Sequence, residues 1–270
     1  MSKIIQITDT HVVSEGQLAY GKVDTAAALE KAVETINRIL PEVGPVDLVV
    51  VTGDLTDFGS MEEYRRFRRL MEPLSLPYRA VPGNHDHREM MRAAFADQGW
   101  MPKDGPIDWI AEFSDVVLIG LDTLVQDASH GRLSGRTLDF LKESMANHPA
   151  KRFLVGLHHP PVTTGIHAMD IQNLREAEPL RDMLKAHPGG ARLICGHVHR
   201  NVVTDWGGII CQIAPGISHA VTLEQRANAT NTLTIEPGAF MLHEIRDNNL
   251  ASHQILSGRF EGPYPFYPTA

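Results

Sequence analysis

The residues of this chain that could do chemistry are grouped in five short motifs. Each motif places carboxylate, imidazole or amide side chains directly after an apolar run, and divalent transition metals bind these types of side chain. The motifs are Asp9-Thr10-His11, Gly53-Asp54-Leu55-Thr56-Asp57, Gly83-Asn84-His85-Asp86, His158-His159-Pro160 and Gly196-His197-Val198-His199. A pair of divalent ions can clamp the attacking and leaving oxygens of a displacement at phosphorus. The motifs therefore predict two-metal chemistry on a phosphate ester.

The spacing within the motifs indicates how the ligands could converge. Asp9 and His11 are two residues apart, as are His197 and His199. We expect a locally extended chain to point both members of each pair the same way. Asp54 follows an apolar run that is typical of a buried strand, where an unpaired carboxylate would lose its hydration. A pair of cations would remove this cost, and a carboxylate can bridge both ions.

Charge counting favours a phosphodiester as the substrate. Two divalent ions carry four positive charges, Asp9 and Asp54 supply two negative charges, and a bound hydroxide leaves the cluster about one charge positive. Asn84 can add a neutral carbonyl oxygen as a further ligand. This balance matches a singly charged phosphodiester. Metal binding should also lower the pKa of the attacking water toward about 7.

The elements that position the motifs alternate along the chain between apolar strands and helically spaced segments. This alternation implies a largely parallel inner sheet flanked by helices. Asp24 and the pair Ser60 and Glu63 are expected to cap two of the helices. The predicted strands are Ile4–Ile7, Asp47–Val51, Tyr78–Val81, Val116–Leu121, Arg152–Leu157 and Arg192–Cys195. The predicted helices are Thr25–Leu40, Ser60–Met71, His87–Asp97, Leu133–Asn147 and Arg175–Ala186.

After Cys195 the pattern changes to antiparallel strands. Turn residues at Trp206-Gly207-Gly208 and Asp247-Asn248-Asn249 separate them. The strands expected are Asn201–Trp206, Gly208–Ile213, Gly238–Arg246 and Leu250–Ser257, with Thr222–Pro237 as a loop. We interpret 1–270 as a single domain with two related halves, in which 201–270 supplies these strands and a tail. The tail, Gly262–Ala270, is either a free end or a contact with a neighbouring subunit.

Composition limits the classes of function. The chain has 270 residues, of which 43% are hydrophobic, and this is ample for the core of an α/β domain. The formal net charge of −8 argues against a surface that coats nucleic acid. The basic run over 65–69 lies on a predicted helix that also carries Glu62 and Glu63. We interpret that run as a solvated, charge-paired face.

The location expected from the sequence is cytoplasmic. No segment approaches the roughly 20 apolar residues that a membrane-spanning helix needs. The start, Met1–Ile5, leads directly into the first motif and leaves no room for a cleaved signal peptide. In such a compartment we expect Cys195 and Cys211 to be buried, reduced side chains rather than disulfide partners.

In their order, the five motifs resemble those of the calcineurin-like metallophosphoesterases. The pattern of that family is D-x-H, G-D, G-N-H-[DE], H-x-P and G-H-x-H. A closer likeness to bacterial glycerophosphodiesterases and class III cyclic-nucleotide phosphodiesterases is carried by Leu18-Ala19-Tyr20-Gly21, His158-His159-Pro160-Pro161, Ala168-Met169-Asp170, Pro215-Gly216-Ile217-Ser218-His219 and Phe240-Met241-Leu242-His243. The resemblance implies an α/β fold, a four-layer α/β/β/α sandwich of two mixed sheets. It also implies that the metals lie at the sheet edge between the two halves.

The resemblance implies a role for each motif residue. One ion would be held by Asp9, His11, Asp54 and His199, and the other by Asp54, Asn84, His158 and His197. His85 matches the residue that contacts the phosphoryl oxygen or the leaving group, where an imidazole can act as general acid or transition-state stabiliser. Asp86 would orient His85 or a neighbouring loop. Weaker candidates for contacts with the ligands are His159, Asp122 and His219, and loop residues that could face the substrate are Tyr20, His167 and Met169.

Two departures from related subfamilies narrow the range of expected substrates and metal ions. Ser/Thr protein phosphatases carry an Arg shortly after the bridging Asp, whereas this chain continues Asp57-Phe58-Gly59. A phosphoprotein substrate is therefore not expected. Purple acid phosphatases have a Tyr ligand where this chain has Asp57, so a tyrosinate-bound ferric ion is not expected either. Asp57 itself is expected to cap the following loop.

The function expected is that of a dinuclear-metal phosphodiesterase. It would hydrolyse glycerophosphodiesters or 3',5'-cyclic nucleotides by attack of a metal-bound hydroxide on phosphorus, with Mn, Fe, Co or Zn as the metal. A non-catalytic scaffold, a phosphomonoesterase and a nuclease of the same fold are the alternatives. The filled ligand positions disfavour a scaffold, and the acidic charge disfavours a nuclease. By resemblance, the expected partners are a small phosphodiester and further copies of the chain in a dimer-based homo-oligomer.

Overall fold

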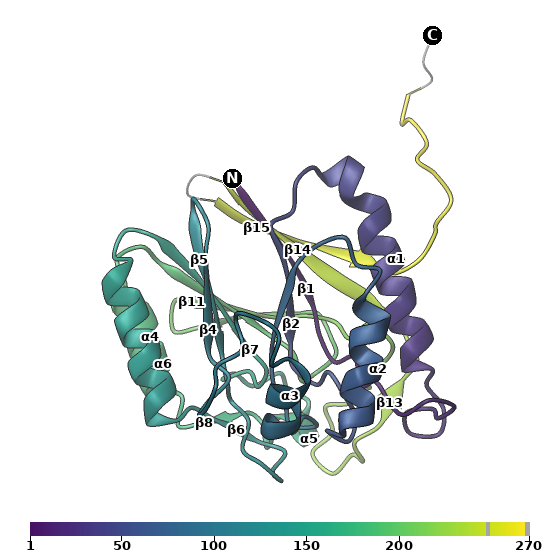
Figure 1. Cartoon of the computed structure of the whole chain (residues 1–270), viewed down its shortest axis with the longest axis horizontal. Helices are drawn as coiled ribbons and strands as arrows, with labels where there is room; N and C mark the ends of the chain where they lie inside the picture. Colours follow the sequence, from purple (N-terminus) through teal and green to yellow (C-terminus); the bar gives the residue numbers. More distant parts are fainter. Residues whose placement is uncertain (247–248, 268–270) are drawn as a thin grey trace.

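Two β-sheets stack face to face between two layers of helices (Figure 1). The computed structural model describes residues 1–246 and 249–267. The first sheet has the order β15-β14-β1-β2-β3, formed by β1 (Ser2–Ile7), β2 (Leu48–Thr52), β3 (Tyr78–Val81), β14 (Ala239–Arg246) and β15 (Asn249–Leu256). The second has the order β10-β11-β9-β7-β5-β4, formed by β4 (Trp109–Glu112), β5 (Val116–Leu121), β7 (Arg152–Leu157), β9 (Ala191–Cys195), β10 (Val202–Trp206) and β11 (Ile209–Ile213).

The helices cover the outer faces of the two sheets (Figure 1). On the first sheet lie α1 (Thr25–Val43), α2 (Met61–Met71) and α3 (Arg88–Ala94), and on the second lie α4 (Gly135–Asn147) and α6 (Glu178–Ala186). Short elements near the ends of the strands are α5 (His167–Asp170) and the two-stranded pairs of β6 (Gly131–Arg132) with β8 (Leu174–Arg175) and of β12 (Ala220–Val221) with β13 (Leu233–Thr234). The four-layer α/β/β/α sandwich implied by the resemblance is confirmed.

The centre of each sheet is parallel and buried on both faces. In the first sheet β1, β2 and β3 pair in parallel, and in the second β5, β7 and β9 do so. The continuous apolar run of β2 follows from this arrangement, because both faces of the strand need apolar side chains. Along β5, Val116 and Leu118 belong to the core that includes the first sheet, whereas Val117 and Ile119 pack in the cluster that includes residues of α4 and α6.

The predicted helix caps are confirmed. The Asp24 side chain accepts a hydrogen bond from the Ala27 backbone N–H at 3.0 Å at the start of α1. Ser60 and Glu63 form a reciprocal capping box at the start of α2. These bonds satisfy backbone donors that a helix start leaves without an intrahelical partner. They fix the residue at which each helix begins after a loop that carries one of the five motifs.

Several predicted boundaries are wrong. The helix predicted over His87–Asp97 ends at Ala94, and Arg175 lies in β8 rather than in a helix. The following helix starts at Glu178 with a proline in its first turn, a position that suits proline because its missing N–H is not needed there. The strand β4 and the helix α5 were not expected, since both are too short to show a clear period.

The C-terminal strands divide between the two sheets. β10 and β11 form an antiparallel hairpin, but β11 pairs in parallel with β9, and the antiparallel pair of β14 and β15 joins β1 instead. The loop predicted over Thr222–Pro237 contains β13. Of the turn predicted at Asp247-Asn248-Asn249, the first two residues lie outside the described residues.

The described part of the tail runs as an extended chain away from the body of the molecule (Figure 1). Phe266 is 99% exposed and Tyr267 is 84% exposed. A contact between this tail and a neighbouring subunit stays a prediction. No helix in the part of the chain that the structure describes is long and apolar enough to cross a membrane.

Two residues of the basic run on α2 are charge-paired, but not with the predicted partners. Arg68 forms two hydrogen bonds with the Asp97 carboxylate, both at 2.7 Å, and Arg69 lies 3.9 Å from a Glu15 oxygen. Glu63 is instead occupied by the capping box. The two cysteines are buried and unlinked, with 3.7 Å between the sulfurs of Cys195 and Cys211.

Candidate metal centre

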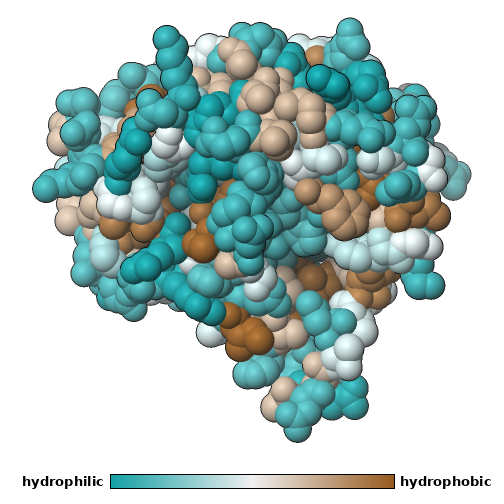
Figure 2. All heavy atoms as spheres, turned by 60° about the horizontal axis from the view of Figure 1, so that its bottom comes forward, coloured by the Kyte–Doolittle hydropathy of each residue, from teal (hydrophilic) through white to brown (hydrophobic). Residues whose placement is uncertain are grey.

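Loops at the carboxyl ends of strands from both sheets bring the five motifs together. In an open α/β sheet this edge is where ligands bind. Asp9 and His11 follow β1, Asp54 follows β2, Asn84 and His85 follow β3, His158 follows β7, and His197 and His199 follow β9. The face on which these strands end is largely hydrophilic, with hydrophobic residues in separate small patches (Figure 2).

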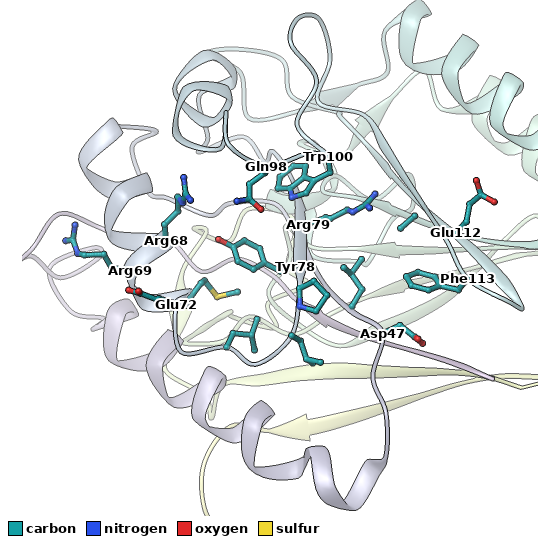
Figure 3. Close-up of a pocket in the computed structure, with 17 residues that line it drawn as sticks. Asp47, Arg68, Arg69, Glu72, Tyr78, Arg79, Gln98, Trp100, Glu112 and Phe113 are labelled. Carbon is teal, nitrogen blue, oxygen red and sulfur yellow. The ribbon is translucent and has the colours of Figure 1, made fainter.

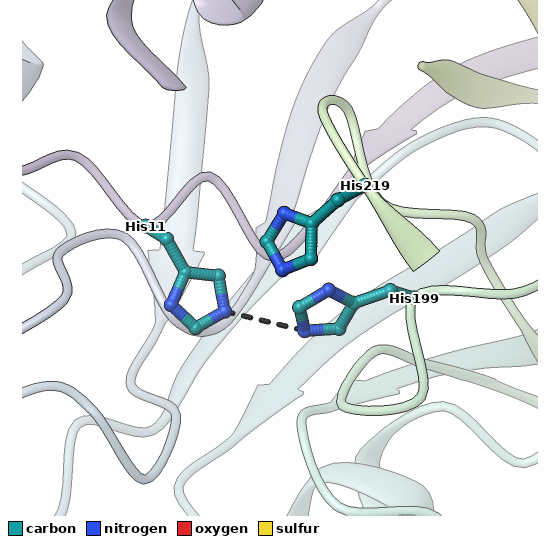
Figure 4. A group of neighbouring side chains, drawn as sticks. All are labelled: His11, His199 and His219. Atoms are coloured by element: carbon teal, nitrogen blue, oxygen red, sulfur yellow. Dashed lines mark hydrogen bonds between the residues drawn. The ribbon is translucent and has the colours of Figure 1, made fainter. Parts of the chain in front are cut away.

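A first group of candidate ligands consists of Asp9, His11, Asp54 and His199, each offering one ligand atom within 4.8 Å of the others. His199 Nε2 lies 3.2 Å from Asp9 Oδ1 and 3.2 Å from His11 Nε2, as the dashed line in Figure 4 marks for the two rings. His11 Nε2 lies 3.5 Å from Asp54 Oδ2. Two imidazole nitrogens and two carboxylates that face one another so closely in a buried site form a suitable set of cation ligands.

A second group lies on the other side of Asp54. His158 Nε2 is 3.3 Å from Asp54 Oδ2, 3.1 Å from Asn84 Oδ1 and 3.3 Å from His197 Nδ1. Asp54 Oδ2 therefore contacts both groups of ligands. This is the position that a bridging carboxylate requires.

The ligand residues converge through left-handed backbone conformations. The φ angles are +54° at Asp9, +42° at His11, +49° at Asp54, +75° at His197 and +53° at His199. The prediction that an extended chain aligns each pair is therefore wrong. A non-glycine residue with such a φ is strained by about 1 to 3 kcal/mol and persists only where its surroundings hold it. Backbone bonds from Asp9 N to Gly53 O, at 3.1 Å, and from His11 N to Asp54 O, at 3.0 Å, hold the first loop.

Two motif glycines are required by close packing around the ligands. A Cβ atom at Gly83 would lie 2.1 Å from Asp54 Oδ1, and a Cβ at Gly53 would lie 2.3 Å from His158 Nδ1. Gly53 also has a φ of +96°. Any side chain at these positions would displace a ligand. The glycines of the G-D and G-N motifs are therefore required because no side chain fits beside the proposed ligands.

Two of the proposed histidine ligands, His158 and His11, are oriented by hydrogen bonds from their other ring nitrogen. His158 Nδ1 donates to the Thr52 carbonyl oxygen at 2.8 Å, and His11 Nδ1 donates to Asp57 Oδ1 at 2.9 Å. Each bond leaves Nε2 free to bind a metal and fixes the ring that carries it. Asp57 was predicted to cap the following loop. Its carboxylate instead orients His11.

The electrostatics of the site favour charged carboxylates held among imidazoles. Burial alone would raise the pKa of Asp54, but the neighbouring histidines, His158 first, hold it well below its usual value. Burial alone would lower the pKa of His158, but the charge of Asp54 and its hydrogen bond raise it to about 9. The buried atoms His197 Nε2 and His199 Nδ1 have no hydrogen-bond partner among the described residues. These two atoms are the outer ring nitrogens, because His197 Nδ1 and His199 Nε2 are the ones that face the ligand groups. Buried carboxylates next to those facing imidazole nitrogens fit a pair of divalent cations.

His85 lies beside the ligands and lines the cavity in front of them. Its backbone N–H donates to Asp54 Oδ1 at 2.9 Å, and its Nδ1 donates to the Asp57 carbonyl oxygen at 2.9 Å. Burial would lower the pKa of this imidazole, but Asp54 and Asp57 outweigh burial and raise it. A protonated Nε2 is thereby favoured, as a proton donor to a leaving oxygen requires.

Asp86 forms its hydrogen bonds with the surrounding loops and not with His85. Its carboxylate accepts hydrogen bonds from the backbone N–H groups of Gly83 at 2.9 Å and Leu55 at 3.1 Å, and from the Tyr64 hydroxyl at 2.9 Å. It thus ties the loop of the second motif to that of the third. Of the two alternatives for this residue, the neighbouring loop is the one in which its contacts lie.

Three of the weaker candidates lie next to the ligands. His219 packs against His199 with 4.5 Å between ring centroids and, as Figure 4 shows, stands beside both His199 and His11. Tyr20 packs against His219 at 5.4 Å. His159 Nδ1 forms a hydrogen bond with Thr123 Oγ1 at 2.8 Å. The buried Nε2 of His159 has no hydrogen-bond partner among the described residues.

Asp122 lies apart from this cluster. Its carboxylate binds the Arg88 guanidinium at 2.7 and 3.0 Å and accepts the backbone N–H groups of Ile107 and Leu124, both at 2.8 Å. These partners anchor the start of α3 to the loops around β4 and β5. The hydrogen bonds of this carboxylate therefore support the scaffold and touch none of the proposed ligands.

A cavity of about 220 Å³ opens directly in front of the ligands. Tyr20 and Met169 line it as expected, whereas His167 is not among its lining residues. Sequence reasoning missed Gln172 and the segment around β13, which contributes Asn231 and Thr232 to the wall of the cavity. The Asn and Thr content of the predicted loop over 222–237 was the available signal, but no spacing rule connects that loop to the motifs.

A larger cavity of about 880 Å³ lies where β2 and β3 begin, at the opposite ends of these strands from the ligands (Figure 3). Tyr78, Trp100 and Phe113 line it together with Arg68 and Arg79. Arg68 is already paired with Asp97, and the Arg79 guanidinium donates to the Ile110 carbonyl and stands over the Trp109 ring at 5.6 Å. The catalytic candidates therefore belong to the smaller cavity.

Replacement of Asn84 by alanine tests one side of the cluster. Because the change removes a neutral oxygen ligand without removing charge, we expect one ion to be bound more weakly by at least about 10-fold while the other is retained. The fold should persist, since Asn84 is only partly buried. Metal content per chain, measured after dialysis against limiting manganese, checks this. Two tightly bound ions in Asn84→Ala would exclude Asn84 as a ligand.

Comparison with known proteins agrees with this site. A family model for calcineurin-like phosphoesterase matches residues 2–201. The chain is 39% identical over 266 residues to the "Probable glycerophosphodiester phosphodiesterase GpdQ" of Arcobacter nitrofigilis, covering 98% of this chain and 96% of that protein. It is 31% identical over 261 residues to the "3',5'-cyclic adenosine monophosphate phosphodiesterase CpdA" of Escherichia coli K12, covering 96% and 92%.

The fold has solved counterparts. A dimetal phosphatase from Danio rerio superposes with a TM-score of 0.62 at 16% identity, covering 95% of this chain and 99% of that one. A purple acid phosphatase from yellow lupin superposes with a TM-score of 0.64 at 14% identity, covering 95% and 51%. At these identities the likeness concerns the fold alone. The family match and the two relatives, together with the clustered motifs, show that this chain belongs to the calcineurin-like phosphoesterase family of metal-dependent hydrolases.

Proposed function

We propose that this protein hydrolyses small phosphodiesters at a two-metal centre, with glycerophosphodiesters as the leading substrate class. The observation that carries the proposal is the place of Asp54, whose Oδ2 lies 3.5 Å from His11 Nε2 and 3.3 Å from His158 Nε2. A carboxylate between two such ligand groups is arranged to bridge two ions. The proposed ligands are Asp9, His11, Asp54 and His199 for one ion and Asp54, Asn84, His158 and His197 for the other.

When bound, two divalent ions would supply an activated water and neutralise charge on the phosphoryl group. The chain's own residues would orient the reactants. Asp54 holds the two halves of the centre together, and Asp57 fixes His11 through its carboxylate and His85 through its carbonyl oxygen. His85 is placed to hold a proton at Nε2 for the departing oxygen.

The cavity favours a diester over a monoester. Its lining residues include no lysine or arginine among the residues that the structure describes. A phosphomonoester carries close to two negative charges at pH 7, and without a lysine or arginine the second charge would be compensated less well than the single charge of a diester. The wall of the cavity also includes the uncharged side chains Tyr20, Met169, Gln172 and Asn231. A neutral polar group such as glycerol suits that wall.

The relatives favour glycerophosphodiesters as the leading class. Identity is higher to the probable glycerophosphodiester phosphodiesterase, at 39%, than to the cyclic AMP phosphodiesterase, at 31%, with nearly complete coverage in both cases. Cyclic nucleotides are the second candidate, because a relative with that activity also spans 96% of this chain.

The deciding experiment compares catalytic efficiency on glycerophosphoethanolamine, cyclic AMP and a phosphomonoester, with the metal content of the protein known. We expect the highest kcat/KM for glycerophosphoethanolamine and the lowest for the monoester. Removal of metal with a chelator should abolish turnover of bis(p-nitrophenyl) phosphate, and manganese should restore it. A protein that binds metal but turns over none of these substrates would support the non-catalytic scaffold instead.

A further inference from the structure

A row of polar side chains crosses the space between the two sheets. It consists of Arg192 in β9, Ser252 in β15, His243 in β14 and Gln6 in β1. Gln6 and His243 are completely buried. Buried polar groups are costly unless their hydrogen bonds are made, so a satisfied row of this kind has a defined geometry.

The hydrogen bonds of the row run in one direction. Arg192 Nη1 donates to Ser252 Oγ at 3.1 Å, and Ser252 Oγ donates to His243 Nδ1 at 2.8 Å. His243 Nε2 then donates to Gln6 Oε1 at 3.0 Å. This pattern requires a neutral imidazole with one donor and one acceptor nitrogen. Burial, aided by the charge of Arg192, lowers the pKa of His243 to about 3 and so keeps the ring neutral.

The other end of the Gln6 side chain reaches both sheets. Its Nε2 donates to Thr52 Oγ1 at the end of β2, at 2.8 Å, and to the Cys195 carbonyl oxygen at the end of β9, at 3.0 Å. β2 belongs to the first sheet and β9 to the second. The carbonyl oxygen and the amide nitrogen of Gln6 are therefore both engaged, and one side chain links three strands besides its own.

The strand ends that Gln6 joins carry proposed metal ligands. Gln6 is three residues before Asp9, Thr52 is two residues before Asp54, and Cys195 is two residues before His197. The Thr52 carbonyl oxygen also accepts the Nδ1 hydrogen of His158. Gln6 thus contacts the bases of the loops that supply both halves of the centre.

We propose that Gln6 is a positioning residue that sets the separation between the ligands from the first sheet and those from the second. The proposal rests on the proposed two-metal function. Apolar contacts between the sheets are non-directional and do not by themselves favour one exact alignment of particular atoms. The hydrogen bonds of Gln6 are directional and oppose such sliding. A metal pair needs this precision, since ligand sites lose function when they are displaced by about 0.5 to 1 Å.

The test replaces Gln6 with methionine, which keeps the length of the side chain and removes its hydrogen bonds. We expect Gln6→Met to bind manganese about 10- to 100-fold more weakly than the wild type. Its dimanganese form should show an altered electron paramagnetic resonance spectrum, because the coupling between two ions depends on their separation. The expected fall in turnover should appear in kcat more than in KM, since the substrate wall of the cavity is unchanged.

A matched control is Gln212→Met. Gln212 lies in β11 and is 4% exposed, and its amide lies 3.5 Å from Oδ1 of Asn201, a residue that follows the last proposed ligand instead of leading into one. Manganese affinity and the resonance spectrum of this variant should match the wild type, even where thermal stability falls. If Gln6→Met does not fold, Thr52→Val removes one of the two acceptors of the Gln6 amide and should weaken manganese binding several-fold.

The outcomes separate the two proposals. A folded Gln6→Met, or in its place Thr52→Val, with wild-type manganese affinity and spectrum would overturn the positioning role while leaving the two-metal function intact. Equal changes in Gln6→Met and Gln212→Met would overturn it as well, because they would reflect general stability. A wild-type protein that binds no second manganese ion would refute the two-metal function itself.

Discussion

Replacement of His85 by alanine is expected to lower kcat for a phosphodiester by about 100-fold or more while both metal ions stay bound. A general acid contributes about 10²- to 10⁴-fold to such a reaction. His85 lines the cavity, its Nδ1 donates to the Asp57 carbonyl oxygen, and its pKa is raised by Asp54 and Asp57 against the effect of burial. Steady-state kinetics and metal analysis on the same sample measure both parts of the expectation.

The control for this variant is His87→Ala. His87 is two residues further along, at the N-cap of α3, and does not line the cavity. Its replacement should leave kcat close to that of the wild type. The loss in His85→Ala should also shrink for substrates with a good leaving group, such as bis(p-nitrophenyl) phosphate, because p-nitrophenolate needs less protonation. Turnover of glycerophosphoethanolamine by His85→Ala at the wild-type rate would refute the role of His85 as a proton donor.

The second large effect is expected for Asp54→Asn. The change is nearly isosteric but removes the negative charge between the two ligand groups, so two cations would repel each other without compensation. We expect metal content to fall from two ions per chain to one or fewer, and kcat/KM to fall by more than the 10- to 100-fold typical of residues behind the ligands. Elemental analysis and diester kinetics provide the measurement.

Asp122→Asn is the matched substitution at a buried carboxylate outside the ligand cluster. Asp122 is 3% exposed and binds Arg88, so this variant should lose stability but keep two metal ions. Should Asp54→Asn also retain two tightly bound ions, Asp54 could not be the bridging ligand. Loss of metal in both variants would indicate that the ions depend on general stability rather than on Asp54.

Much of this site could be predicted from the sequence because its parts are local. The strand β2 is recognisable from an uninterrupted apolar run, and the capping box of α2 from the spacing of Ser60 and Glu63. The five motifs follow strands, and parallel strands end at one edge of a sheet. Their meeting was therefore foreseeable from the order of elements alone.

The remaining features depend on tertiary contacts that no local pattern records. The left-handed conformations of Asp9 and His11 are held by backbone bonds to the loop around Gly53, which is remote in sequence. Asp57 looked like a loop cap, yet its carboxylate lies against His11 across 46 positions of sequence. Asn231 reaches the cavity from a segment without periodicity. Gln6 looks like an ordinary polar interruption of a strand until its partners in both sheets are known.

The division of the proposed ligands between two sheets has a consequence for how this protein should respond to heat. Each ion would have ligands from both sheets, so separation of the two sheets would release both ions at once. An ion that binds the folded chain but not the unfolded chain adds RT ln(1 + [L]/Kd) to the free energy of unfolding, where [L] is the free concentration of the ion. This is about 2.7 kcal/mol when [L] is 100 times Kd. The melting temperature of this protein is therefore expected to rise with the concentration of metal around it.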